Sequence, residues 1–139
     1  MRKMYPVIFT QTSDAILVEV PDLAILTQGT TIENAFDMAR DAISITIVSM
    51  EDNNEAIPIP TKIANVDVTH ATFADEGESF TSIVDVDIAE YRKRIDTRPV
   101  RRNVSLPCWL NHEADLAGIN VSRVLQEALI KVLGITNRY

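Results

Sequence analysis

The pattern of apolar and polar positions predicts an antiparallel sheet at the start of the chain. Residues 5–10 (YPVIFT) and 15–20 (AILVEV) are rich in aromatic and β-branched residues, which favour strands. The QTSD segment between them has turn composition, so the two strands are expected to form a hairpin. A short third strand is predicted near residues 26–28, ending at Gly29.

A helix is predicted directly after the third strand. Thr30 and Glu33 have the spacing of a capping box, in which a hydroxyl accepts from an exposed amide and a carboxylate reaches back. The β-branched run over residues 45–48 favours helix less and leaves the end of the helix open. An apolar stripe at helical spacing follows the cap: Ile32, Ala35, Phe36, Ala39, Ile43, Ile47 and Met50.

Residues 51–79 carry the weakest pattern and are predicted as a loop region. The IPIP segment at 57–60 is expected to be extended, because each proline disfavours helix in the residue before it. A clear strand is then predicted over residues 80–88 (FTSIVDVDI). Asp87 and Glu90 have the spacing of a second helix start.

The chain is expected to divide after Arg98, into domains over residues 1–98 and 99–139, because the TRP sequence at 97–99 interrupts the pattern. Residues 100–106 (VRRNVSL) predict a short strand. Pro107 opens a helix that Gly118 ends. Asn120 is a natural N-cap for a last helix that ends at Gly134, and the apolar side of this helix comprises Val121, Val124, Leu125, Ala128, Leu129, Val132 and Leu133.

A strand and two helices in about forty residues cannot bury their apolar faces alone, and a single strand leaves its ladder groups unpaired. We therefore expect two copies to pair their strands antiparallel across a two-fold axis, with four helices closing a shared core. The side chains expected in this dimer core are Val104, Leu106, Val124, Leu125, Ala128 and Leu129.

Composition and charge are those of a globular protein with two unlike halves. Apolar residues make up 46% and charged residues 24%, no apolar run reaches the roughly 18 residues of a membrane span, and no secretory signal is legible, so a cytoplasmic location is expected. Residues 1–98 hold 17 acids and 8 bases, a net charge of −9, which suits a basic protein partner. Residues 99–139 hold 3 acids and 5 bases, a net charge of +2, which suits phosphates.

Both halves resemble known families. The sequence VRRNVSLPCWLNHEADLAGINVSRVLQEAL resembles a ribbon-helix-helix module, whose paired strands enter the DNA major groove. The segments YPVIF, VEVPDL, TQGTTIENAFDMARDAI and SIVDVDIAEYRKRI resemble the HicB antitoxin domain, a truncated RNase H-like unit. The chain departs from that family where Asp22-Leu23 runs directly into Ala24-Ile25-Leu26.

The resemblance implies an α+β fold, with a partial RNase H-like antiparallel sheet and packed helix followed by a ribbon-helix-helix. It implies that the first domain blocks a small basic HicA-type ribonuclease, and that the second binds operator double-stranded DNA and represses the shared operon. Family members assemble as dimers or tetramers. Two alternatives stay open: a stand-alone ribbon-helix-helix regulator whose first domain senses another ligand or protein, and an RNase H-like nuclease.

Strand alternation assigns the residues that meet DNA. Val104 and Leu106 share the core face, so the outward side chains Arg101, Asn103 and Ser105 are expected to contact bases. The start of the last helix offers free N–H groups and the positive end of the helix dipole. Phosphate contacts are therefore expected from Asn120, Val121 and Ser122.

No catalytic residue, metal or cofactor is expected. Two-metal catalysis needs carboxylates that converge on one pocket. Asp85 and Asp87 share a strand face and could bind a cation together, but an exposed face and a helix cap explain them as well. His70 and His112 lack metal-ligand spacing, and Cys108 has no legible activating partner. The other candidate carboxylates are Asp14, Glu19 and Asp22.

Overall fold

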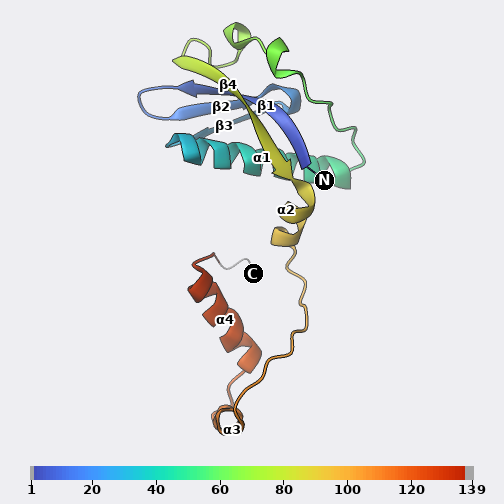
Figure 1. Cartoon of the computed structure of the whole chain (residues 1–139), viewed down its shortest axis with the longest axis vertical. Coiled ribbons are helices and arrows are strands. Elements are labelled where there is room, and N and C mark those ends of the chain that lie inside the picture. The colour runs from blue at the N-terminus through green and yellow to red at the C-terminus, as the bar shows by residue number, and fades with distance from the viewer. Residues whose placement is uncertain (1, 137–139) are drawn as a thin grey trace. The chain divides into compact units, whose positions relative to one another are not determined.

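A computed structural model describes residues 2–136, which form two compact units that meet between Arg94 and Ile95 (Figure 1). The first unit contains a four-stranded antiparallel sheet in the order β3-β2-β1-β4. Its strands are β1 (Arg2–Gln11), β2 (Ile16–Val20), β3 (Ile25–Gly29) and β4 (Glu78–Asp87). The predicted hairpin, third strand and late strand are thus all present. The assignment of separate functions to residues 1–98 and 99–139 stays a prediction.

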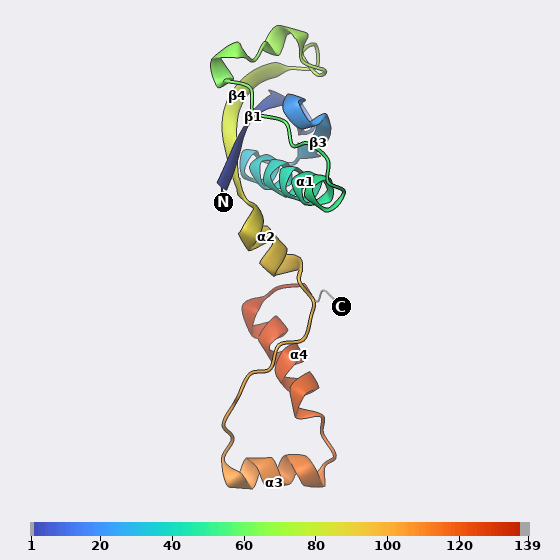
Figure 2. The ribbon, with the colours of Figure 1, turned by 90° about the vertical axis from the view of Figure 1, so that its right-hand side faces the viewer.

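Strand β1 is the centre of the first unit. It pairs with β2 through Ile8↔Glu19 to Gln11↔Ile16, and with β4 along its whole length, from Arg2↔Asp87 to Gln11↔Glu78. Every residue from 5 to 10 is buried, because both faces of the strand are covered. One face packs against α1 and the other lies beneath the chain that connects α1 to β4 (Figures 1 and 2).

Helix α1 (Ile32–Asp52) packs its apolar stripe on the sheet, and Ala35, Ala39, Ile43 and Ile47 are fully buried. The helix continues through the β-branched residues 45–48, because burial of this stripe outweighs their weaker helix propensity.

The predicted Thr30–Glu33 capping box is wrong by one residue at each position. Thr31 is the N-cap, and its hydroxyl accepts from the amide of Asn34 at 3.1 Å, while the Asn34 side chain accepts from the amide of Thr30 at 2.9 Å. An amide oxygen therefore fills the role that the sequence assigned to a carboxylate.

A line of stacked rings runs from the core between α1 and the sheet to the exposed side chain of Phe80. The Phe9 ring centroid lies 4.4 Å from that of Phe36 on α1 and 5.2 Å from that of Phe80 on β4. Offset stacking of this kind adds to the apolar area that the rings bury. The core also contains Tyr5 and many aliphatic side chains, including Val7, Val18, Val20, Val84 and Val86.

The connection from α1 to β4 is longer than a loop between neighbouring elements requires, and it covers the second face of the sheet. It contains two short 3-10 helices, η2 (Ile63–Asn65) and η3 (Val68–His70), which the sequence did not predict. Residues 57–60 contain no helix or strand, and the Tyr5 hydroxyl donates to the carbonyl of Pro58 at 2.8 Å.

Three helices follow β4. Helix α2 (Ile88–Ile95) begins as predicted, with the Asp87 carboxylate accepting from the Glu90 amide at 3.0 Å. In the second unit, α3 (Cys108–Leu116) and α4 (Val121–Leu133) confirm the two predicted helices, and Gly118 and Gly134 both adopt a φ of 65° just after them. The predicted strand over residues 100–106 is not formed in the single chain, because no second strand lies beside it.

Gly29 sets the distance between β3 and α1. A Cβ added at this position would lie 2.5 Å from the backbone N and Cα of Ala35, so the helix or the strand would have to move. We predict that Gly29→Ala lowers the free energy of unfolding by about 1–3 kcal/mol, the usual cost of overpacking. Urea unfolding checks this, with exposed Gln28→Ala as the control; an unchanged midpoint for Gly29→Ala would show that the contact relaxes freely.

Candidate functional site

The residues predicted to contact DNA bases lie in the segment between α2 and α3. Arg101, Asn103 and Ser105 are all exposed, and this stretch carries neither helix nor strand in the single chain. These three side chains would share one outward face only if the segment formed a strand, and that strand needs a second copy of the chain to pair with. The base-contacting role of these three residues therefore stays a prediction.

The predicted phosphate-contacting residues lie at the beginning of α4. Asn120 is the N-cap, and its side chain accepts from the Arg123 amide at 3.1 Å, so that oxygen is occupied by capping. Between residues 2 and 136, the amides of Val121 and Ser122 have no hydrogen-bond acceptor. Free amides at a helix start are the groups that bind an anion, and the phosphate-contacting role of these residues stays a prediction.

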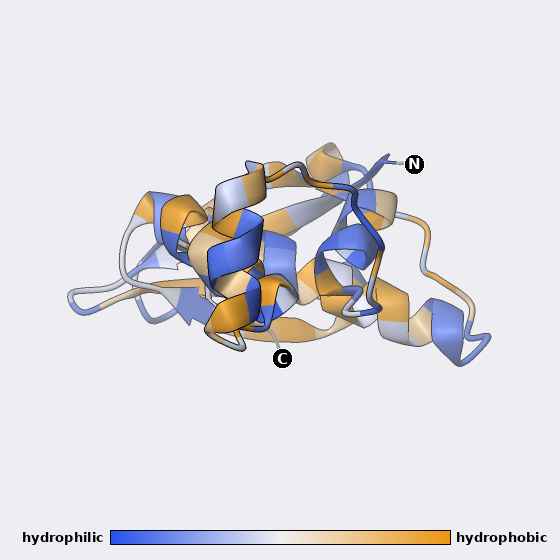
Figure 3. Ribbon diagram, turned by 90° about the horizontal axis from the view of Figure 1, so that it is seen from below, coloured by the Kyte–Doolittle hydropathy of each residue, from blue (hydrophilic) through white to orange (hydrophobic). Residues whose placement is uncertain are grey.

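The second unit leaves most of its apolar side chains exposed. Val104, Leu106, Val124 and Leu129 are 39–52% exposed, Ala128 is exposed as well, and Leu125 is half-buried. Outside the predicted dimer core, Trp109 and Val132 are 68% and 82% exposed. Hydrophobic and hydrophilic residues alternate around the helices in Figure 3. An apolar surface of this extent on so small a unit indicates an unfilled interface.

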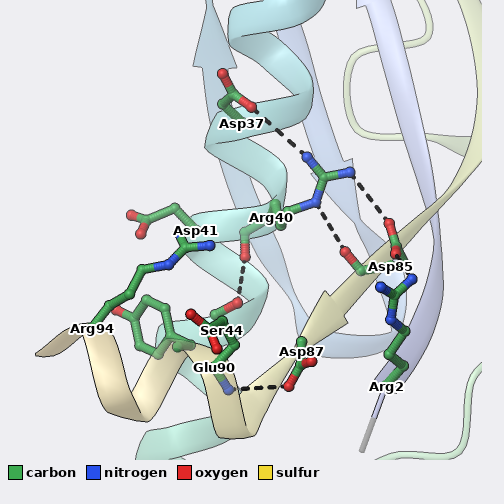
Figure 4. A pocket seen from close by; sticks show the side chains of 10 residues that line it. Arg2, Asp37, Arg40, Asp41, Ser44, Asp85, Asp87, Glu90 and Arg94 are labelled. Atoms are coloured by element: carbon green, nitrogen blue, oxygen red, sulfur yellow. Dashed lines mark hydrogen bonds and ion pairs between the residues drawn. The ribbon is translucent and has the colours of Figure 1, made fainter.

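Asp85 and Asp87 line a pocket between α1, β4 and α2 (Figure 4), but each carboxylate is already engaged. Asp85 forms ion pairs with Arg2 at 3.1 Å and Arg40 at 3.3 Å, and Arg40 also donates to the Asp85 carbonyl at 3.0 Å. The Glu90 amide, which donates to Asp87, holds the pKa of that carboxyl below its ordinary value. Sequence reasoning missed Arg40, because nothing local marks a helix arginine as the partner of a distant strand.

Glu19 and Asp22 fasten the connecting segment to the sheet. The Asp22 carboxylate accepts from the amide and hydroxyl of Thr61 at 2.9 and 2.6 Å. The Glu19 carboxylate accepts from the amide and hydroxyl of Thr72 at 3.0 and 2.6 Å. Each acid therefore holds one threonine through a pair of hydrogen bonds. Within residues 2–136 no cluster of histidine, cysteine and carboxylate side chains has the geometry to bind a metal ion.

The chain belongs to the HicB-like antitoxin family of bacterial toxin-antitoxin systems, whose family description matches residues 5–126. It is therefore an antitoxin of a toxin-antitoxin system. A comparison with curated proteins yields no match. In the part of the chain that the structure describes, every helix is too short or too polar to cross a membrane.

Solved structures of toxin-antitoxin proteins have the same fold. A chain of a toxin-antitoxin complex from Streptococcus pneumoniae is 25% identical, with a TM-score of 0.60 over 94% of this chain and 99% of that one. The antitoxin HicB from Burkholderia pseudomallei is 20% identical, with a TM-score of 0.50 over 94% of this chain and 96% of that one.

Asp67 is the N-cap of η3, and its side chain is hydrogen-bonded to the next turn of the chain. Its carboxylate accepts from the Thr69 hydroxyl, from His70 and from the Thr69 amide, which together lower its pKa from 3.8 to about 2. Because the pKa is lower in the folded chain, the stabilisation is complete above pH 3.8 and is lost as the pH falls through about 2.

We predict that Asp67→Asn reduces the hydrogen-exchange protection of the Thr69 amide at neutral pH. The difference from wild type should shrink as the pH approaches 2, where about half of the wild-type carboxyl groups are themselves protonated. NMR exchange rates corrected for intrinsic pH dependence measure this, with Asp75→Asn as the control. A difference that stays constant with pH would mean that the Asp67 charge is irrelevant to the turn.

Proposed function

We propose that this antitoxin binds and blocks a HicA-type ribonuclease through its first domain, and that its second domain is a ribbon-helix-helix that represses the shared operon. The observation that carries the toxin-binding part is the similarity, over almost the whole of both chains, to a protein of the Streptococcus pneumoniae toxin-antitoxin complex. A net charge of −9 on residues 1–98 supports a basic partner for this part of the chain.

The ribbon-helix-helix assignment rests on the properties of the second unit. Two helices separated by Gly118 expose apolar side chains, and the segment before them has no strand partner among residues 2–136. A second copy would supply both the missing strand and the missing half of the core. We therefore propose a homodimer, which a further pairing would extend to a tetramer, acting on operator DNA in the cytoplasm.

We propose that the first unit, a four-stranded antiparallel sheet with a packed helix, is a partial RNase H-like fold and is not an enzyme. Of the five carboxylates considered for metal catalysis, Glu19 and Asp22 bind threonines, Asp85 binds arginines and Asp87 caps a helix. Asp14 is exposed in the β1–β2 turn. Carboxylates committed to these contacts do not converge on a common cation.

Co-expression tests neutralisation directly. The protein should restore growth to cells that express the toxin encoded beside its own gene, and the double variant Asp85→Asn, Asp87→Asn should restore growth to a similar extent. The reason is that both carboxylates contact the antitoxin's own residues. Failure of the wild-type protein to bind that toxin would favour a stand-alone regulator, whereas a metal-dependent nuclease activity lost in the double variant would favour the enzyme.

Binding titrations should separate the two kinds of DNA contact. Asn103→Ala should lose about 1–3 kcal/mol of binding free energy on DNA from upstream of its own operon and almost none on a scrambled duplex. Ser122→Ala should weaken binding to both duplexes equally, because phosphate contacts carry no sequence information. If Arg101 contacts a phosphate rather than guanine, its removal lowers the salt slope by about one. Equal losses on both duplexes for Asn103→Ala would show that the strand faces the other way.

A further inference from the structure

Strand β4 forms one edge of the sheet, so half of its backbone groups point away from β1. The amide of Thr12 donates to the carbonyl of Ala15 and closes the β1–β2 hairpin. Backbone groups alternate in direction along β1 from this bond. The N–H and C=O groups of Ile8 and Thr10 therefore point toward β2, and those of Val7 and Phe9 point toward β4.

The outward residues of β4 are therefore those at odd positions, since Phe80 and Ser82 pair with the inward groups of β1. The Arg40 guanidinium provides independent support, because it donates to the outward carbonyl of Asp85 at 3.0 Å. Arg40 thus covers the end of the edge near α2. At the other end η2 and η3 lie near β4, but among the described residues no hydrogen bond from another element reaches the outward backbone groups.

The open part of the edge runs from Ser79 to Ile83. Within residues 2–136, the outward amides of Ser79, Thr81 and Ile83 have no hydrogen-bond acceptor. The outward carbonyls have at most the Ser82 hydroxyl, which lies 3.5 Å from the Ile83 carbonyl. Phe80 and Ile83 project to opposite faces of the sheet beside this stretch, and they are 41% and 48% exposed. A strand added here would find both ladder groups and apolar contacts on each face.

Charge favours a basic occupant. Asp75, Glu76 and Glu78 precede the open edge, are exposed, and form no ion pair in the part of the chain that the structure describes. A second copy fits poorly, because antiparallel self-pairing centred on Thr81 would place Asp75 of each copy opposite Asp87 of the other, with Glu76 next to that pair. Like charges opposite one another destabilise a sheet.

We propose that the β4 edge from Ser79 to Ile83 binds an extended basic segment of the toxin, which adds to the sheet as a fifth strand. This assignment rests on the proposed toxin-binding function and specifies which surface performs it. In this arrangement the backbone of one strand forms the hydrogen bonds to the toxin, and the apolar and acidic side chains around it select the partner.

The test combines amide exchange with two pairs of variants in the full-length protein. Mixing it with the toxin encoded beside its gene should slow exchange of the Thr81 and Ile83 amides. Thr81→Pro removes one outward donor and should raise the Kd for the toxin by about tenfold or more. The variant should still fold, because an edge strand tolerates proline where the N–H faces solvent. Its control is Leu26→Pro, which removes an outward N–H from the opposite edge strand, β3.

Charge reversal forms the second pair. Glu78→Lys should weaken toxin binding and reduce its dependence on salt, whereas Glu55→Lys, also exposed and outside every ion pair of the described residues, should do neither.

Three outcomes overturn the proposal. If wild type binds the toxin while the Thr81 and Ile83 amides exchange as before, toxin binding stands and the edge assignment fails. If these amides are already protected in the antitoxin alone and Thr81→Pro lowers its oligomeric state, the occupant is a second copy. If wild type does not bind the toxin at all, the proposed function fails first.

Discussion

The pairing of β1 with β4 along ten residues is the interaction on which the first unit depends. It joins the first strand of the chain to one that begins at Glu78, and it forces everything between them to pack around the sheet. Helix α1 takes one face and the connecting segment takes the other, so residues 5–10 of β1 are buried on both sides. Apolar burial on both sides of one strand is the main stabilising term in so small a domain.

The elements that could be predicted from the sequence are those with local signals. The alternating strands, the apolar stripe of α1 and the caps at Asp87, Asn120 and Gly134 depend on residues a few positions apart. The connecting segment could not be predicted in this way, because its anchors join Thr61 to Asp22 and Thr72 to Glu19, 39 and 53 residues apart. The capping error at Thr30 arose because Thr30 and Thr31 are adjacent hydroxyls with equally plausible partners.

The candidate sites divide along the same line. The sequence placed Asn120 at the start of α4 correctly, because an N-cap is a local feature. It could not show that Asp85 is neutralised by Arg40, since that contact spans 45 residues. The strand at 100–106 is a different case: its pattern is legible, but its hydrogen bonds require a partner strand that one chain does not contain.

The complete burial of residues 5–10 also has a consequence for synthesis. The six-residue YPVIFT segment is strongly β-forming and uncharged, as aggregation-prone sequences are. Pro6 is the one residue in it that opposes aggregation. This segment is synthesised before its β4 partner, which follows some seventy residues later. At about 5–20 residues per second, the nascent chain exposes one apolar strand for several seconds before the sheet can close. Folding of the first unit is thus timed by translation of its last strand, and β1 is the segment that a nascent-chain chaperone would need to shield.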